Sequence, residues 1–135
     1  MSQITLDATE QSLNSVVDFV DMVLDHIECP TRARRQIHVV ADEIFSNIAR
    51  YAYGHDTGDA TVRMGFESPN HMLVLTFEDH GKPFDPCRSN DPDTALTIED
   101  RPVGGLGIFM VKQMMDVVEY CRRNGCNVLT LKKQL

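Results

Sequence analysis

The chain has 135 residues, of which 42% are hydrophobic and 24% are charged, and its formal net charge is −7 at pH 7. These values are typical of one compact soluble domain with its own hydrophobic core, over residues 1–135. The acidic balance, with no basic stretch to offset it, argues against a nucleic-acid-binding protein. Because the apolar runs are too short to cross a bilayer and no signal peptide is recognisable, we expect no membrane association and a cytoplasmic location.

The N-terminus predicts a short strand and then a helix. The strand covers residues 3–6, where apolar and polar residues alternate. Asp7 and Glu10 match a capping box, which predicts that a helix begins there. Apolar residues recur at helical spacing from Leu13 to Ile27, and the opposite side is acidic.

A second helix is predicted from Pro30 to about Gly54. Glu43 and Asn47 lie four residues apart and therefore project side by side next to its apolar face. Arg50 continues this polar row, which on its own is most simply a solvated surface. The apolar face is formed by Ile37, Val40, Ala41, Ile44 and Ile48.

Two strands joined by a turn at Ser68-Pro69-Asn70 come next and predict a hairpin. The second strand, residues 71–79, places one side-chain row on a single face because side chains alternate along a strand. That row is Leu73, Leu75, Phe77 and Asp79. Since an unpaired buried carboxylate is costly, we expect Asp79 to lie at a pocket mouth or to be hydrogen-bonded.

Residues 81–102 are rich in proline, glycine and aspartate and predict a long loop, with a short helical turn near residues 93–98. Loops of this length are commonly functional lids. A glycine-rich motif follows and begins an apolar helix that runs to Asp116: Gly104, Gly105, Leu106 and Gly107. Glycines at a helix start let backbone amides approach an anion such as phosphate, although a flexible hinge would use the same residues.

The final elements are a strand over residues 117–123, a hairpin turn at Asn124-Gly125 and a strand over residues 127–133. The complete order is strand, helix, helix, strand, strand, loop, helix, strand, strand. This order predicts an α/β fold, a two-layer α/β sandwich whose mixed, largely antiparallel sheet carries its helices on one face.

Three motifs together resemble the ATP-binding domain shared by gyrase, Hsp90, histidine kinases and MutL, the GHKL-type or Bergerat fold. They are DEIFSNIARYAY, EDHGKPFDP and RPVGGLGIFMVKQMMD, and the resemblance covers nearly the whole chain. Within this group, the chain is most similar to the small stand-alone serine kinases that act as bacterial anti-sigma factors, of the SpoIIAB and RsbW kind.

The resemblance implies a role for each motif. Asn47 would be the protein ligand of a Mg²⁺ ion that bridges the phosphates of ATP. Asp79 would accept a hydrogen bond from the adenine amino group, and Gly81 would let the base lie close to the backbone. Glu43 would be the catalytic base, the alternative being that it only helps to hold a metal-bound water. The remaining ATP-binding residues that the resemblance implies are Arg101, Gly104, Gly105, Leu106 and Gly107.

The function that the resemblance implies is an ATP-dependent serine/threonine protein kinase and anti-sigma regulatory factor. Its partners would be a STAS-type antagonist, which it phosphorylates, and a sigma factor or similar regulator, which it sequesters. The resemblance also implies a homodimer. The alternative is a non-catalytic ATP-binding module that switches between partners.

Two residues depart from the pattern of the wider family. Pro83 replaces the second glycine of an Asp-x-Gly-x-Gly box, which is usual in the stand-alone branch. Cys126 stands where relatives commonly place a threonine that supports a water bound to adenine, and a thiol is a poorer hydrogen-bonding group. This second departure leaves room for the non-catalytic alternative.

Overall fold

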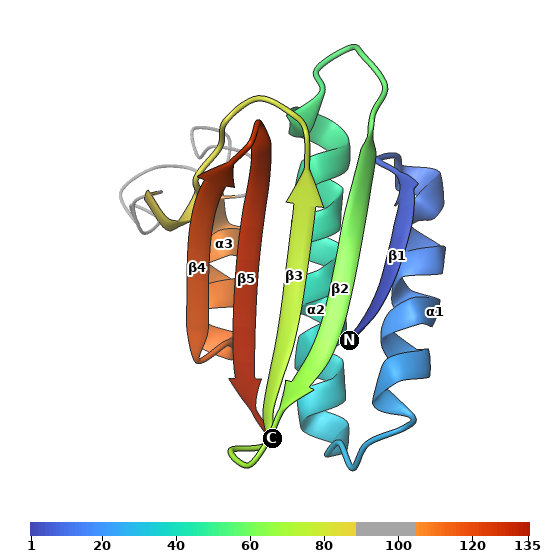
Figure 1. Cartoon of the computed structure of the whole chain (residues 1–135), viewed down its shortest axis with the longest axis vertical. Helices are drawn as coiled ribbons and strands as arrows, with labels where there is room; N and C mark the ends of the chain where they lie inside the picture. Colours follow the sequence, from blue (N-terminus) through green and yellow to red (C-terminus); the bar gives the residue numbers. More distant parts are fainter. Residues whose placement is uncertain (89–104) are drawn as a thin grey trace.

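The computed structural model describes residues 1–88 and 105–135, and within them five strands form one sheet that carries three α-helices on one face (Figure 1). The strands are β1 (Ser2–Asp7), β2 (Asp59–Glu67), β3 (Met72–Asp79), β4 (Val117–Arg123) and β5 (Cys126–Gln134). The helices are α1 (Leu13–Leu24), α2 (Thr31–Asn47) and α3 (Gly105–Met114). The predicted two-layer α/β sandwich is confirmed.

The sheet order is β1-β2-β3-β5-β4, and every neighbouring pair is antiparallel. The two central strands, β3 and β5, are therefore distant in sequence and adjacent in space. Asn124 and Gly125 join β4 to β5 with φ angles of 54° and 78°, as the predicted hairpin turn requires. None of the helices in the described residues is long and apolar enough to cross a membrane.

The start of α1 differs from the prediction. Asp7 is the last residue of β1 and pairs with Asp59 of β2, so its backbone belongs to the sheet and not to a helix. A short 3-10 turn, Glu10–Ser12, precedes α1, and neither helical segment has a side-chain N-cap bond. The predicted capping box is therefore wrong, and α1 ends at Leu24 and not at Ile27.

The helical segment that begins with α2 ends where the sequence predicts. After Asn47 it continues as a π-helical turn, Ile48–Ala52, and Gly54 then takes a left-handed φ of 61° that glycine adopts without strain. Arg50 is exposed on this turn and pairs with Glu10 at 3.5 Å, which confirms its interpretation as a surface residue.

The core lies between the sheet and the helices. The inward row of β3 is buried as predicted, with exposed fractions of 0% at Leu73 and Leu75, 1% at Phe77 and 5% at Asp79. Apolar residues of all three helices belong to the same buried cluster as this row, including Val20 of α1, Ile44 of α2 and Ile108 of α3. The apolar row thus ends in a carboxylate on the helix-covered face.

We expect Leu75→Ala to lower the free energy of unfolding by about 2–5 kcal/mol, because Leu75 is fully buried opposite Leu131 in the centre of the sheet. Urea denaturation measures this change. Thr76→Ala is the control, since Thr76 points to the other face, and should cost less than about 1 kcal/mol. Equal losses from both variants would contradict the assignment of the buried face.

Candidate functional site

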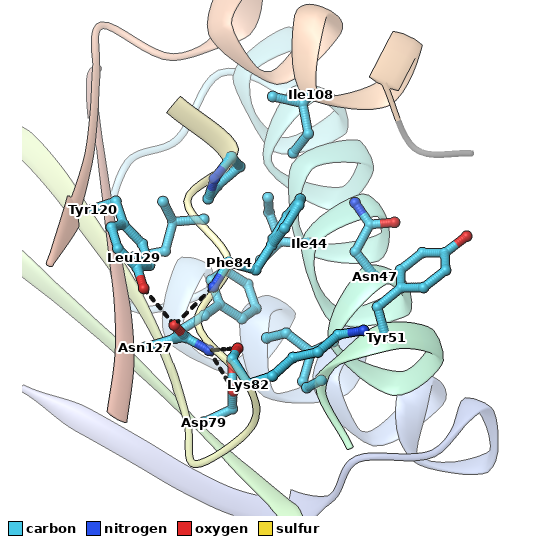
Figure 2. Close-up of a pocket in the computed structure, with 14 residues that line it drawn as sticks. Ile44, Asn47, Tyr51, Asp79, Lys82, Phe84, Ile108, Tyr120, Asn127 and Leu129 are labelled. Atoms are coloured by element: carbon cyan, nitrogen blue, oxygen red, sulfur yellow. Dashed lines mark hydrogen bonds between the residues drawn. The ribbon is translucent and has the colours of Figure 1, made fainter. Parts of the chain in front are cut away.

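A pocket that is open to solvent lies between α2, α3 and the adjoining ends of β3, β4 and β5. Figure 2 shows Asp79 and Asn127 on one side of it and Asn47 and Tyr51 on the other. Its walls are mainly apolar and include Ile44, Ile48, Phe77, Ile108 and Leu129. An apolar pocket that carries a few polar groups suits a small organic ligand.

The carboxylate of Asp79 forms one polar end of the pocket. The backbone N–H of Gly81 donates to its Oδ1 at 2.8 Å, and Nδ2 of Asn127 donates to the same oxygen at 3.0 Å. Asp79 was expected to lie at a pocket mouth or to be hydrogen-bonded, and in the structure it does both. Both donors bind Oδ1, and no donor to Oδ2 is found among the described residues, so Oδ2 is available to a ligand.

Asn127 is a site residue that the sequence analysis missed. It lies opposite Asp79 in the pairing of β3 with β5 and is 7% exposed. The strand pairing was the signal that could have identified it, because directly paired residues share a face.

Cys126, by contrast, lies on the face of the sheet away from the pocket. Its Sγ is 3.1 Å from Nδ1 of His80, and burial, with the neighbouring Glu78 acting in the same direction, raises the pKa of its thiol. Cys126 is therefore not the residue that supports Asp79 in this chain. Asn127 occupies the position beside Asp79.

Gly81 is packed against the end of the π-helical turn. A Cβ at Gly81 would lie 2.2 Å from the backbone oxygen of Ala52, which is too close for any side chain. The N–H of Lys82 donates to that same oxygen at 2.9 Å, and Arg122 donates to the carbonyl of Gly81 at 2.8 Å. Gly81 is thus needed for the close approach of two backbones.

Glu43 and Asn47 meet on α2, as their spacing predicts. Nδ2 of Asn47 donates to Oε1 of Glu43 at 3.2 Å. Oδ1 of Asn47 is buried and has no hydrogen-bond partner within the described residues. An unpaired buried oxygen is costly, so this atom is a candidate ligand for a group that enters the pocket.

The carboxylate of Glu43 lies against Gly107 in the first turn of α3. A Cβ at Gly107 would come within 1.9 Å of Oε1 of Glu43. Glycine at this position therefore provides room for the carboxylate, a steric reason that the sequence analysis did not give. The contact brings one residue of the glycine motif next to the polar row on α2.

The other predicted site residues lie at or beyond the edge of the described chain. Gly105 and Leu106 belong to the first turn of α3. Arg101 and Gly104, and the helical turn expected near residues 93–98, lie outside the described residues. Besides Asn127, the side chains that line the pocket and were not assigned to it from the sequence include Tyr51, Lys82, Phe84 and Tyr120.

Comparison with known proteins identifies the family. The family model of the histidine kinase-like ATPase domain matches residues 6–133. The chain belongs to this family. ATP is therefore its nucleotide, and the resemblance drawn from the three motifs is confirmed.

The relatives of the chain include named kinases. It is 30% identical over 102 residues to the serine/threonine-protein kinase BtrW of Bordetella bronchiseptica, a match that covers 74% of this chain and 70% of that protein. It is 26% identical over 98 residues to the serine-protein kinase RsbW of Bacillus cereus, covering 70% of this chain and 60% of RsbW.

Two solved structures share the fold at low sequence identity. The RsbU and RsbW domains of Rv1364c from Mycobacterium tuberculosis superpose with a TM-score of 0.65 at 14% identity, over 100% of this chain and 33% of that one. The histidine kinase domain from Erythrobacter litoralis EL346 gives 0.60 at 14% identity, over 93% of this chain and 60% of that one.

The residues present fit a magnesium ion in one respect that the structure shows directly. The unpaired Oδ1 of Asn47 is a hard oxygen donor at the pocket. The described residues contain no cluster of three or more His, Cys, Asp or Glu side chains that could hold a metal. A cation at Asn47 would therefore complete its shell with water and phosphate oxygens, as Mg²⁺ does.

We expect Asp79→Asn to weaken ATP binding by about 1–3 kcal/mol, because the amide would place a donor where the pocket offers an acceptor. Titration calorimetry with ATP measures the change. Glu78→Gln is the matched control, since Glu78 is the neighbouring acid on the opposite face of β3 and pairs with Arg63. Unchanged affinity of Asp79→Asn would show that the base lies elsewhere.

Proposed function

We propose that this chain is an ATP-dependent serine/threonine protein kinase that also acts as an anti-sigma regulatory factor. The observation that carries the proposal is the position of the Glu43 carboxylate between Asn47 and Gly107 at the start of α3. Oδ1 of Asn47 has no partner among residues 1–88 and 105–135. A general base, a metal ligand and a helix N-terminus are the groups that phosphoryl transfer needs in one place. The names of BtrW and RsbW as protein kinases support it.

The two polar ends of the pocket give ATP a direction. The adenine amino group donates to the carboxylate of Asp79, and the apolar walls contact the base. The phosphates then extend toward Asn47 and α3. The backbone amides of Gly104, Gly105, Leu106 and Gly107 and the side chain of Arg101 bind them, as the family resemblance implies.

Asn47 would hold a magnesium ion through Oδ1. Its orientation is set in advance, because Nδ2 is engaged by Glu43 and the oxygen must therefore point away from that carboxylate. Bound Mg²⁺ would neutralise charge on the phosphates and help to align them.

Glu43 accepts the proton in the transfer step. The hydroxyl oxygen of a partner serine or threonine forms a bond to the γ-phosphorus, while the bond from that phosphorus to the β,γ-bridging oxygen breaks. The hydroxyl proton passes to the Glu43 carboxylate and ADP leaves. The packing of Glu43 against Gly107 limits how far the base can move away from this path.

The phosphorylated partner is an antagonist protein of the STAS type, and the second partner is a sigma factor or similar regulator. The chain acts as a homodimer in this proposal. These assignments rest on its likeness to RsbW, of which it spans 60%. The non-catalytic alternative drew its support from Cys126, and that support is lost because Asn127 is the residue beside Asp79.

We expect Glu43→Gln to lower phosphoryl transfer to a STAS-type antagonist at least about 100-fold, because the amide cannot accept the proton. Its Oε1 can still accept from Asn47, so ATP affinity should stay within about threefold. Transfer of labelled γ-phosphate and calorimetry measure the two quantities.

Asp42→Asn is the control for this variant, because Asp42 is the adjacent acid on α2, is exposed and accepts from Ser46. It should keep full transfer. Normal transfer by Glu43→Gln would show that Glu43 is not the base. Absence of transfer by the unmutated chain to its cognate antagonist would contradict the kinase proposal.

We expect Gly107→Ala to reduce transfer by about 10- to 100-fold, because the added methyl displaces the Glu43 carboxylate and a small misplacement of a catalytic group is costly. The same transfer assay measures it. Gln113→Ala, farther along α3 and exposed, controls for helix substitution. Full activity of Gly107→Ala would show that the position of Glu43 is not critical.

A further inference from the structure

We infer that Asn127 and Tyr120 form a positioning pair that holds Asp79 as a hydrogen-bond acceptor and thereby sets the selectivity of the pocket for adenine over 6-oxopurines. The inference deepens the proposed function and rests on its placement of the ATP base at Asp79. Neither residue belongs to the three sequence motifs, and both are drawn with their bonds in Figure 2.

The side chain of Asn127 has its full hydrogen-bonding capacity engaged by the protein. Nδ2 donates to Oδ1 of Asp79 at 3.0 Å and to the carbonyl of Lys82 at 2.8 Å. Oδ1 accepts from the backbone N–H of Phe84 at 3.3 Å and from the hydroxyl of Tyr120. An asparagine side chain has two N–H donors and two acceptor lone pairs. Asn127 therefore has none left for the base and acts through Asp79.

Backbone groups decide which way the Asn127 amide faces. The carbonyl of Lys82 can only accept, so it must face Nδ2, and the N–H of Phe84 can only donate, so it must face Oδ1. With the amide oriented in this way, Asp79 always meets a donor. The Tyr120 hydroxyl must then donate to Oδ1, which adds a third restraint from β4.

This arrangement determines what the pocket offers to a base. Oδ1 of Asp79 is held by Gly81 and Asn127, so the carboxylate cannot rotate without losing two bonds in a site that is 5% exposed. Oδ2 then presents an acceptor. The amino group of adenine satisfies it, whereas the 6-carbonyl of hypoxanthine or guanine places a second acceptor against it, and unpaired polar groups are rejected strongly.

The network also places an aromatic side chain at the pocket. Phe84 is 50% exposed and lines the pocket, and its N–H is bound to Asn127. Residues 82 and 84 are thus both held by one amide. That amide therefore links the loop that follows Asp79 to the carboxylate itself.

The test compares the affinities of the full chain for Mg-ATP and Mg-ITP by calorimetry, since inosine triphosphate differs from ATP at the 6-position. The unmutated chain should prefer ATP. Asn127→Leu should weaken ATP binding about 10- to 100-fold and ITP binding by less than about threefold, so that the preference shrinks. Tyr120→Phe should act in the same direction by about 2- to 10-fold. Thr130→Val, on the open face of β5, should leave the preference unchanged.

A double-mutant cycle separates positioning from general damage to the fold. In an Asp79→Ala background, Asn127→Leu should change ATP affinity by less than about threefold, because its effect passes through the missing carboxylate. Additive losses in the cycle would overturn this inference but not the proposed function. So would an unchanged ATP-to-ITP ratio in Tyr120→Phe or in folded Asn127→Leu. Absence of ATP binding by the unmutated chain would overturn the proposed function as well.

Discussion

A carboxylate buried at the end of an apolar strand is the constraint on which the rest of this pocket depends. Asp79 follows Leu73, Leu75 and Phe77 on the inward face of β3, and at 5% exposure it must be supplied with donors by the protein. One donor comes from the turn just after the strand and the other from the paired strand β5. The need to satisfy one acid therefore ties the loop after β3, the register of the central strands and the edge strand β4 into one polar cluster.

The two polar ends of the pocket differ in a way that has functional meaning. At the Asp79 end, every bond of the supporting amide is made within the protein, so the acceptor is in place before a ligand arrives. At the Asn47 end, a buried oxygen has no partner in the part of the chain that the structure describes. The first end is preorganised for recognition, while the second is completed only by what binds. This division suits a ligand whose base is read by shape and hydrogen bonding and whose phosphates bring a metal with them.

Much of this could be predicted from the sequence, because periodicity and turn chemistry act locally. The two-layer sandwich, the burial of Asp79 and the pairing of Glu43 with Asn47 follow from spacings of two and four residues. The capping box failed because the β1–β2 ladder extends through Asp7, which is a non-local effect. The close contacts of two glycines could not be predicted from local sequence patterns either. Gly81 against Ala52 and Gly107 against Glu43 join segments that are far apart in the chain, and only the packed structure shows which atom fills the space beside each glycine.

The error at Cys126 shows how strongly strand register determines chemistry. Moving one position along β5 exchanges the two faces of the sheet, so that a thiol beside His80 is replaced by an amide beside Asp79. A sequence motif fixes position along the chain, but the direction of a side chain depends on the pairing of β5 with β3. At 14% identity the solved relatives share the fold, and a shared fold does not require the same groups around the carboxylate. Here the acceptor is held by a direct amide contact whose orientation is set by two backbone groups. Selectivity for the base then depends on the fold of the Gly81–Phe84 loop as much as on Asp79 itself.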